Sequence, residues 1–223
     1  MPLILTKKIN YDLSLNVWRL DETLEDLNAQ VILDVEEENY LNSFGNVTRK
    51  KQWLGYRILL QHLLEGKRIK ICYDQFGKPF IPGSECHLSV SHSVDYVAAI
   101  INRKGHIGID IERIRERIER VKDRFLSEEE LKNIGAEQRL EKLHICWGAK
   151  ESLYKWYGKP DVDFKADMML EQFHYLCIGK GMFRATMNLP EGIGYFTIHY
   201  QKIGDYMLVW AVPSSQFAVP GKE

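Results

Sequence analysis

The order of helical and strand-like segments is the feature that most constrains the fold of this chain. Apolar residues recur every three or four positions over 49–64, which predicts a helix. A second helical region begins at the capping box of Ser127 and Glu130 and continues over 140–157. Each helical region is followed by runs typical of strands: 69–73, 87–93, 96–101 and 107–111, then 174–178, 183–187, 195–200 and 207–212. Helix followed by strands, twice over, predicts an α+β protein.

The composition is typical of a soluble globular protein. Of the 223 residues, 45% are hydrophobic and 27% are charged, enough to bury a sizeable core without disulfides. The net charge of -1 argues against a nucleic-acid-binding protein. The N-terminus lacks the apolar core of a signal peptide. The longest apolar run, Tyr96 to Ile101, is far shorter than the roughly 20 residues of a membrane helix.

The cysteines are too sparse for a disulfide scaffold. Cys72, Cys86, Cys146 and Cys177 include no pair with CxxC spacing, so we expect reduced and mostly buried thiols. Together with the composition, this predicts a cytoplasmic protein that contacts neither membrane nor nucleic acid.

Charge is segregated along the chain. Eight acidic residues and no basic one lie between Asp21 and Glu38, whereas eight basic and only two acidic residues lie between Arg49 and Lys78. Such runs are typical of solvated helix faces. The basic run equally fits a surface that attracts an anionic ligand or partner. Segregation alone leaves both interpretations open.

Two carboxylates alternate with isoleucines from Gly108 to Glu112. Side chains two apart on a strand share a face, so Asp110 and Glu112 lie together while the isoleucines pack on the other face. Neighbouring carboxylates repel one another, and a hard cation such as Mg²⁺ is one way to compensate them. An exposed strand face with Arg113 as a counter-ion is the other.

Three further segments carry polar groups that chemistry can use. Glu151 and Lys155 are i and i+4 on the second helix, either as an exposed ion pair or as part of the packed, aromatic helix around them. His92, beside Ser91 on an alternating strand, is either structural or a phosphate contact. Lys78, in a Gly-Lys-Pro turn, is either solvated or a positive charge for the same anion.

Four motifs in order carry a family resemblance. Gly-Lys-Pro at 77–79, Ser-His-Ser at 91–93, Gly-Ile-Asp-Ile-Glu at 108–112 and Trp-x-x-Lys-Glu-Ser-x-x-Lys at 147–155 are similar to the 4′-phosphopantetheinyl transferases. Among these enzymes, the chain looks most like the surfactin-synthetase-activating (Sfp) type. The resemblance implies Mg²⁺-dependent transfer of the phosphopantetheine arm of coenzyme A to a serine of an apo acyl or peptidyl carrier protein. Adenosine 3′,5′-bisphosphate would be released.

The resemblance also implies roles for individual residues. Asp110, Glu112 and Glu151 would ligate the metal. Lys155 or Glu151 would act as the base that takes the serine proton, directly or through water. The residues that would hold the phosphates of coenzyme A are Lys78, Ser91 and His92 and, on a looser match, Arg49 and Lys51.

The family's fold supplies further expectations. It consists of two similar half-domains related by a pseudo-twofold axis, each with a small antiparallel sheet packed against helices, and coenzyme A binds in the cleft between them. We expect an N-terminal half-domain over 1–104, with the phosphate contacts. A C-terminal half-domain over 105–223 would hold the metal site and the catalytic helix. The protein is expected to be a monomer.

Two departures keep an alternative open. The family often continues with Gly-Lys-Gly after the last motif lysine, whereas this chain has Gly158-Lys159-Pro160. Proline fixes φ and removes an amide donor. The acidic run also takes the place of a lysine pair expected near the N-terminus. The alternative is a non-catalytic protein that binds coenzyme A or a nucleotide and recruits an acidic partner. A different Mg²⁺-dependent phosphoryl-transfer enzyme is a third reading, although a Walker-type glycine loop is lacking.

Overall fold

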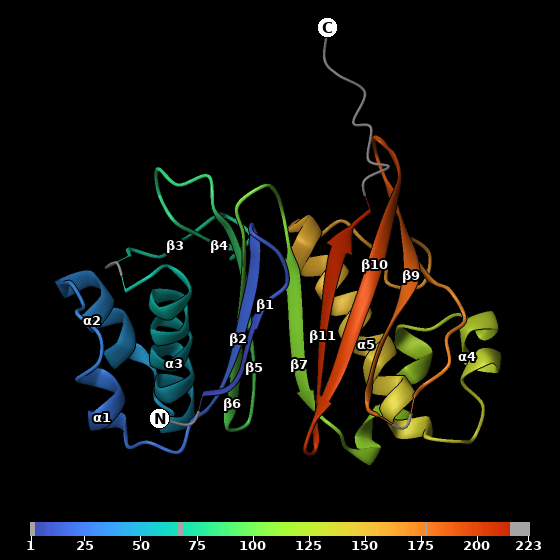
Figure 1. Ribbon diagram of the computed structural model, residues 1–223, viewed down its shortest axis with the longest axis horizontal. Coiled ribbons are helices and arrows are strands. Elements are labelled where there is room, and N and C mark those ends of the chain that lie inside the picture. Colours follow the sequence, from blue (N-terminus) through green and yellow to red (C-terminus); the bar gives the residue numbers. More distant parts are fainter. Residues whose placement is uncertain (1–2, 67–68, 177, 215–223) are drawn as a thin grey trace, which may run out of the picture. The chain divides into compact units, whose positions relative to one another are not determined.

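The computed structural model describes residues 3–66, 69–176 and 178–214. The chain divides into two units, Met1–His106 and Ile107–Glu223 (Figure 1). Each unit combines an antiparallel sheet with helices, which confirms the α+β class.

The first unit is built on a four-stranded antiparallel sheet with three helices on one side (Figure 1). The strand order is β1 (Leu3–Lys8), β2 (Leu13–Arg19), β6 (Tyr96–Asn102) and β5 (His87–Ser93). The helices are α1 (Leu24–Asn28), α2 (Val35–Ser43) and α3 (Val47–Leu63). A short hairpin pairs β3 (Cys72–Tyr73) with β4 (Pro79–Phe80). The predicted helix over 49–64 and strands over 87–93 and 96–101 therefore form.

The acidic run supplies the beginnings of α1 and α2. Thr23 with Asp26, and Asp34 with Glu37, form capping boxes that satisfy backbone N–H groups at the two N-termini. Acidic residues in these first turns also interact favourably with the helix dipole. Acidic residues of this run therefore have a structural role, because they cap and stabilise the N-termini of α1 and α2.

Arg57, from the basic run, is a buried structural residue on α3. It is 5% exposed, and its guanidinium carbon lies 3.3 Å from the centre of the Trp53 ring. It donates hydrogen bonds to Glu37 Oε1 at 3.4 Å and to the Tyr56 hydroxyl at 2.7 Å. Carboxylate, ring and hydroxyl together compensate the buried charge.

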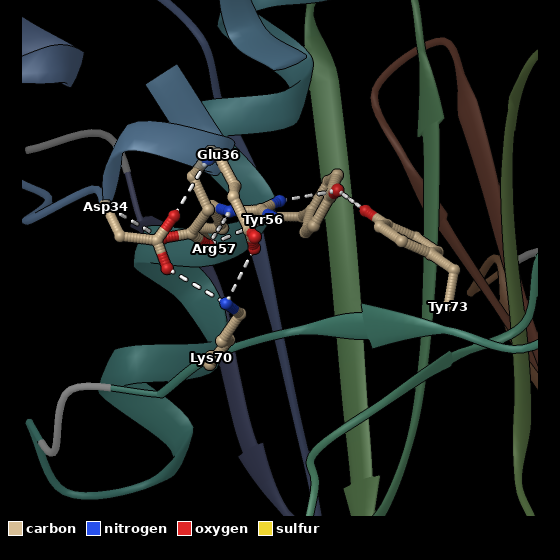
Figure 2. A network of polar contacts seen from close by, with 7 residues as sticks. Asp34, Glu36, Tyr56, Arg57, Lys70 and Tyr73 are labelled. Atoms are coloured by element: carbon tan, nitrogen blue, oxygen red, sulfur yellow. Dashed lines mark hydrogen bonds and ion pairs between the residues drawn. The ribbon is translucent and has the colours of Figure 1, made fainter. Parts of the chain in front are cut away.

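The same network reaches the β3–β4 hairpin (Figure 2). The hydroxyl groups of Tyr56 and Tyr73 are hydrogen-bonded to each other, and Tyr73 is the last residue of β3. Just before this strand, Lys70 Nζ pairs with Asp34 Oδ2 at 3.1 Å and Glu36 Oε2 at 2.9 Å. Helices α2 and α3 thereby fix the hairpin whose turn carries Lys78.

The second unit is built on a five-stranded antiparallel sheet. Its order is β7 (Gly108–Arg113), β11 (Tyr206–Pro213), β10 (Gly192–Ile203), β9 (Lys180–Leu189) and β8 (Met168–Leu170). The α-helices are α4 (Glu128–Ile134) and α5 (Arg139–Tyr157), and α5 packs on β7 and β11. Two short 3₁₀ helices, η1 (Glu116–Arg120) and η2 (Lys122–Arg124), precede α4. The Ser127–Glu130 capping box is present, and α5 ends where Gly158 adopts a φ of 75°.

Two strand predictions need correction. Residues 174–176 and 178 form no strand, and Cys177 lies outside the described residues. The aromatic side chains there pack on the sheet instead of joining it: Phe173 stacks on Phe183 at 4.3 Å, and Tyr175 on Tyr200 at 5.9 Å between ring centres. The run predicted over 69–73 pairs only at Cys72–Tyr73.

Among the described cysteines, all three are free thiols, as predicted. Cys146 is buried, and burial raises its pKa to about 12. Cys72 and Cys86 are only partly buried, so the prediction of burial holds for one of the three. Over the described ranges, no helix has both the length and the apolar character that crossing a membrane requires.

Candidate active site

The two carboxylates of β7 lie on the face of the strand that meets α5. Asp110 is 4% exposed and Glu112 is half-buried, while Ile109 and Ile111 are completely buried on the opposite face. The predicted sharing of a face is therefore observed for this pair. The exposed strand face considered as an alternative is wrong for Asp110, because the side chain is covered.

Lys155 of α5 pairs with Asp110. Its Nζ donates to Asp110 Oδ1 at 2.7 Å and to the carbonyl of Ile109 at 3.1 Å. The side chain of Lys155 is 26% exposed and that of Asp110 is 5% exposed. The contact gives the buried carboxylate a counter-charge on the neighbouring element, which such a group requires.

Glu151, one helical turn before Lys155, joins this group electrostatically. Burial raises its pKa to about 7, with further increases from the charges of Asp110 and Glu112 and an opposing effect of Lys155. A proton on Glu151 is thus nearly balanced between bound and released near neutral pH. We call Asp110, Glu112, Glu151 and Lys155 the carboxylate cluster.

The carboxylate cluster has the donor chemistry of a Mg²⁺ site, although its atoms are not gathered around one point. Three carboxylates are the oxygen ligands that a hard divalent cation prefers. Across residues 3–66, 69–176 and 178–214, however, no three His, Cys, Asp or Glu side chains converge as metal ligands. The positive charge next to Asp110 is that of Lys155. The three carboxylates are thus ligands of the type that Mg²⁺ prefers, and the Lys155 ammonium compensates the negative charge of Asp110.

Two glycines mark the close approach of α5 to the sheet, Gly108 at β7 and Gly148 at β11. A Cβ atom on Gly108 would lie 1.8 Å from the backbone oxygen of Ser152, and one on Gly148 would lie 2.7 Å from Val209. Real Cβ atoms do not come this near to other heavy atoms. The strand that carries Asp110 therefore meets the helix that carries Lys155 at Gly108, a position without a side chain.

Replacing Gly108 with alanine should lower the free energy of unfolding by about 1–3 kcal/mol, the usual cost of overpacking. The obstacle is helix backbone, which cannot rotate away. Urea unfolding followed by circular dichroism measures the change. Gly105→Ala is the matched control, because a Cβ there meets open space and its φ is not positive, so its effect should stay within about 0.5–1 kcal/mol. Equal stability of the two variants would contradict the close approach.

In the first unit, two of the predicted phosphate contacts touch each other. Arg49 lies in the first turn of α3, where the Asn46 side chain caps its backbone N–H, and its guanidinium is hydrogen-bonded to His92 Nε2 on β5. Ser91, the neighbour of His92, is 7% exposed. Helix α3 and strand β5 thus bring a guanidinium and an imidazole together from positions 43 residues apart.

The other two predicted phosphate contacts lie elsewhere in this unit. Lys51 is two residues beyond Arg49, on the opposite side of the helix, and its Nζ donates to the carbonyl of Leu20 at 3.4 Å. Lys78, on the β3–β4 turn, has its Nζ 3.2 Å from His106 Nδ1. Burial lowers the pKa of Lys78 to about 8, opposed by the charge of Asp74.

Sequence reasoning assigned no role to Lys150, which is buried beside the cluster. Its Nζ donates to Glu130 Oε2 at 2.8 Å and to the carbonyls of Phe164 and Met168 at 2.7 and 3.1 Å. Its position on the helix could have indicated burial, because Cys146, four residues before it, and Leu153, three residues after it, are both apolar and buried. His106 was also missed, since a histidine after a strand has no distinguishing pattern.

Comparison with known proteins finds similarity to one family over part of the chain. The family model of the 4′-phosphopantetheinyl transferase superfamily matches residues 106–175. Over this part the chain is similar to 4′-phosphopantetheinyl transferases. The matched segment contains every member of the carboxylate cluster. Arg49, Lys78 and His92 lie outside it.

Individual phosphopantetheinyl transferases align over about half of the chain. AcpT from Escherichia coli O157:H7 is 33% identical over 119 residues, which cover 49% of this chain and 59% of that protein. The gsp protein from Aneurinibacillus migulanus is 31% identical over 144 residues, covering 54% and 59%. Sfp from Bacillus subtilis (strain 168) is 31% identical over 103 residues, covering 44% and 46%. The matched part thus spans about half to three fifths of these relatives' lengths.

Proposed function

We propose that the protein transfers the 4′-phosphopantetheine arm of coenzyme A to a serine hydroxyl of an apo acyl or peptidyl carrier protein. The serine oxygen forms a bond to the phosphorus of the arm, and the bond from that phosphorus to adenosine 3′,5′-bisphosphate breaks. The observation that carries the proposal is the carboxylate cluster within the matched segment, with Lys155 bonded to buried Asp110 and Glu151 beside them. The proposed enzyme is a cytoplasmic monomer.

The metal site belongs to the proposal. Asp110, Glu112 and Glu151 would hold Mg²⁺, which when bound neutralises the negative charge of the coenzyme A pyrophosphate. The donor set is appropriate to that ion, as described above. Without bound Mg²⁺, Lys155 compensates the negative charge of Asp110, because the two side chains form an ion pair.

The proton of the serine hydroxyl needs an acceptor, and the cluster offers two. Glu151, with a pKa raised to about 7, accepts a proton more readily than an ordinary carboxylate. Lys155 can do so only after passing its own proton onward, directly or through water. We propose that one of these two takes the serine proton.

The first unit is proposed to bind the phosphates of coenzyme A. Arg49, Ser91, His92 and Lys78, with Lys51 as the weakest member, would supply cationic and hydroxyl donors for the phosphate oxygens. We also propose the roles assigned to the half-domains 1–104 and 105–223, their pseudo-twofold relation and the coenzyme A cleft between them. These assignments come from the family resemblance.

A mass-shift assay tests the transfer. The protein is incubated with coenzyme A and Mg²⁺ and with apo carrier proteins from fatty-acid, polyketide and peptide synthesis. We expect at least one carrier to gain the mass of one phosphopantetheine group. Samples without coenzyme A or with EDTA serve as controls. If no carrier gains mass while calorimetry shows coenzyme A binding, the non-catalytic binding protein is the better description, a possibility that the Gly158-Lys159-Pro160 segment supports.

Binding of adenosine 3′,5′-bisphosphate should weaken as the pH rises above about 8. Below that pH Lys78 is an ammonium in both the free and the bound protein, so its pKa does not affect affinity. Above it, free Lys78 loses its proton whereas a bound phosphate favours the charged form, and binding must then take up a proton. Calorimetry from pH 6.5 to 9.5 measures this. Lys78→Arg, whose side chain stays charged, should flatten the profile, and an equally steep profile in that variant would contradict the role of Lys78.

A further inference from the structure

The backbone of Lys78 is fixed by its turn. Asp74 Oδ1 accepts hydrogen bonds from the backbone N–H groups of Phe76 and Lys78, each at 2.9 Å. The Asp74 N–H in turn donates to the Lys78 carbonyl at 3.0 Å. Gly77 adopts a φ of 81°, which few other residues tolerate. The turn therefore presents the Lys78 side chain from one defined backbone position.

His106 fixes the other end of that side chain. An ammonium group has N–H donors and no acceptor, so in the 3.2 Å contact His106 Nδ1 must be the acceptor and carry no proton. The contact orients the ammonium group through one of its three N–H donors. His106 follows β6 in the chain and meets the turn from a separate element.

His87 supports the His106 ring. Their ring centres are 4.4 Å apart at an angle of 57°, and His87 is the first residue of β5. The titratable groups that act on the Lys78–His106 pair are Asp74 on the turn and His87 on β5. Partial burial, the charge of Lys78 and His87 all lower the pKa of His106. Each of these effects keeps His106 neutral and able to accept the hydrogen bond.

We propose that His106 is a positioning residue, which holds the Lys78 ammonium in place for a phosphate group of coenzyme A, with His87 as its support. The proposal rests on the proposed function, because it takes Lys78 to contact that cofactor. His106 itself is not assigned a contact with coenzyme A. Its effect on binding should therefore depend entirely on the presence of Lys78.

A double-mutant cycle tests this dependence. Calorimetry at pH 7 compares coenzyme A binding to the full chain with His106→Leu, Lys78→Met and the double variant. We expect His106→Leu to weaken binding roughly threefold to tenfold, the scale of one partly exposed hydrogen bond. In the Lys78→Met background the same change should have no further effect. His106→Asn places an oxygen acceptor where Nδ1 was and should restore binding to within about twofold of the natural chain.

A second measurement needs no coenzyme A. Titration of the His106 ring protons by NMR should give a higher pKa in Lys78→Met than in the natural chain, because a neighbouring positive charge has been removed. An unchanged His106 pKa, or a loss of affinity from His106→Leu that persists without Lys78, would overturn the positioning role alone. Failure of the natural chain to bind coenzyme A would instead refute the proposed function.

Discussion

Replacing Lys150 with methionine should lower the free energy of unfolding by about 3–5 kcal/mol. Methionine fits the apolar surroundings, but it leaves the carboxylate of Glu130, 10% exposed, without its counter-ion. Removing one partner of a buried ion pair has a cost of this size because the remaining charge is uncompensated. Chemical denaturation measured by the fluorescence of Trp147 and the other tryptophans reports the change.

The double variant Lys150→Met with Glu130→Gln separates charge from packing. Glutamine removes the buried charge and keeps one side-chain oxygen. That oxygen can serve either the Ser127 N–H or the Leu170 N–H, which Glu130 binds through Oε2 at 2.8 Å and Oε1 at 3.0 Å. We expect this variant to be more stable than Lys150→Met alone. A further loss of stability in the double variant would show that the ion pair is not the reason for the effect.

Replacing Asp110 with asparagine should lower the rate of carrier modification at least about 100-fold, the scale for losing one preorganised electrostatic contact in an active site. The amide oxygen still accepts the hydrogen bond from Lys155, so the fold should persist. The negative charge, which both the proposed Mg²⁺ site and the Lys155 ion pair use, is lost. Mass spectrometry of the carrier over time gives the rate.

Asp123→Asn is the matched control for this substitution. The Asp123 side chain is 71% exposed on η2, and its contact with Lys122 is long, at 3.7 Å. It should keep the natural rate and the natural melting temperature. A natural rate in Asp110→Asn would show that the carboxylate cluster is not the site of transfer. Thermal melts of both variants exclude unfolding as the cause of a lower rate.

The regular elements could be predicted where local patterns determine them. The alternation around Asp110 and the capping box at Ser127 each depend on a few adjacent residues, and both are present in the structure. The run over 174–178 shows where pattern fails. Tyr175 in this run, and Phe173 just before it, stack on Tyr200 and Phe183, which come later in the chain, so these rings pack on the sheet.

For the candidate site, the sequence indicated residues that lie close together but not how they pair. The motifs placed Asp110 and Lys155 together through family resemblance, whereas the direct ion pair between them depends on the close approach of α5 at Gly108. Arg57 is the opposite case. As one of a run of basic residues it suggested a charged surface, yet it is buried against Trp53 and Glu37. Sequence separation hides such partners, since Glu37 lies 20 residues away.

The several roles of Glu130 have a consequence for how the second unit opens. Its carboxylate caps α4 at Ser127, binds Lys150 of α5 and accepts the Leu170 N–H of β8. Neither the first turn of α4 nor the edge strand β8 can separate without exposing the same ion pair. Their opening is therefore coupled into one cooperative step, and their amide protons should exchange with solvent at a common, slow rate instead of fraying independently.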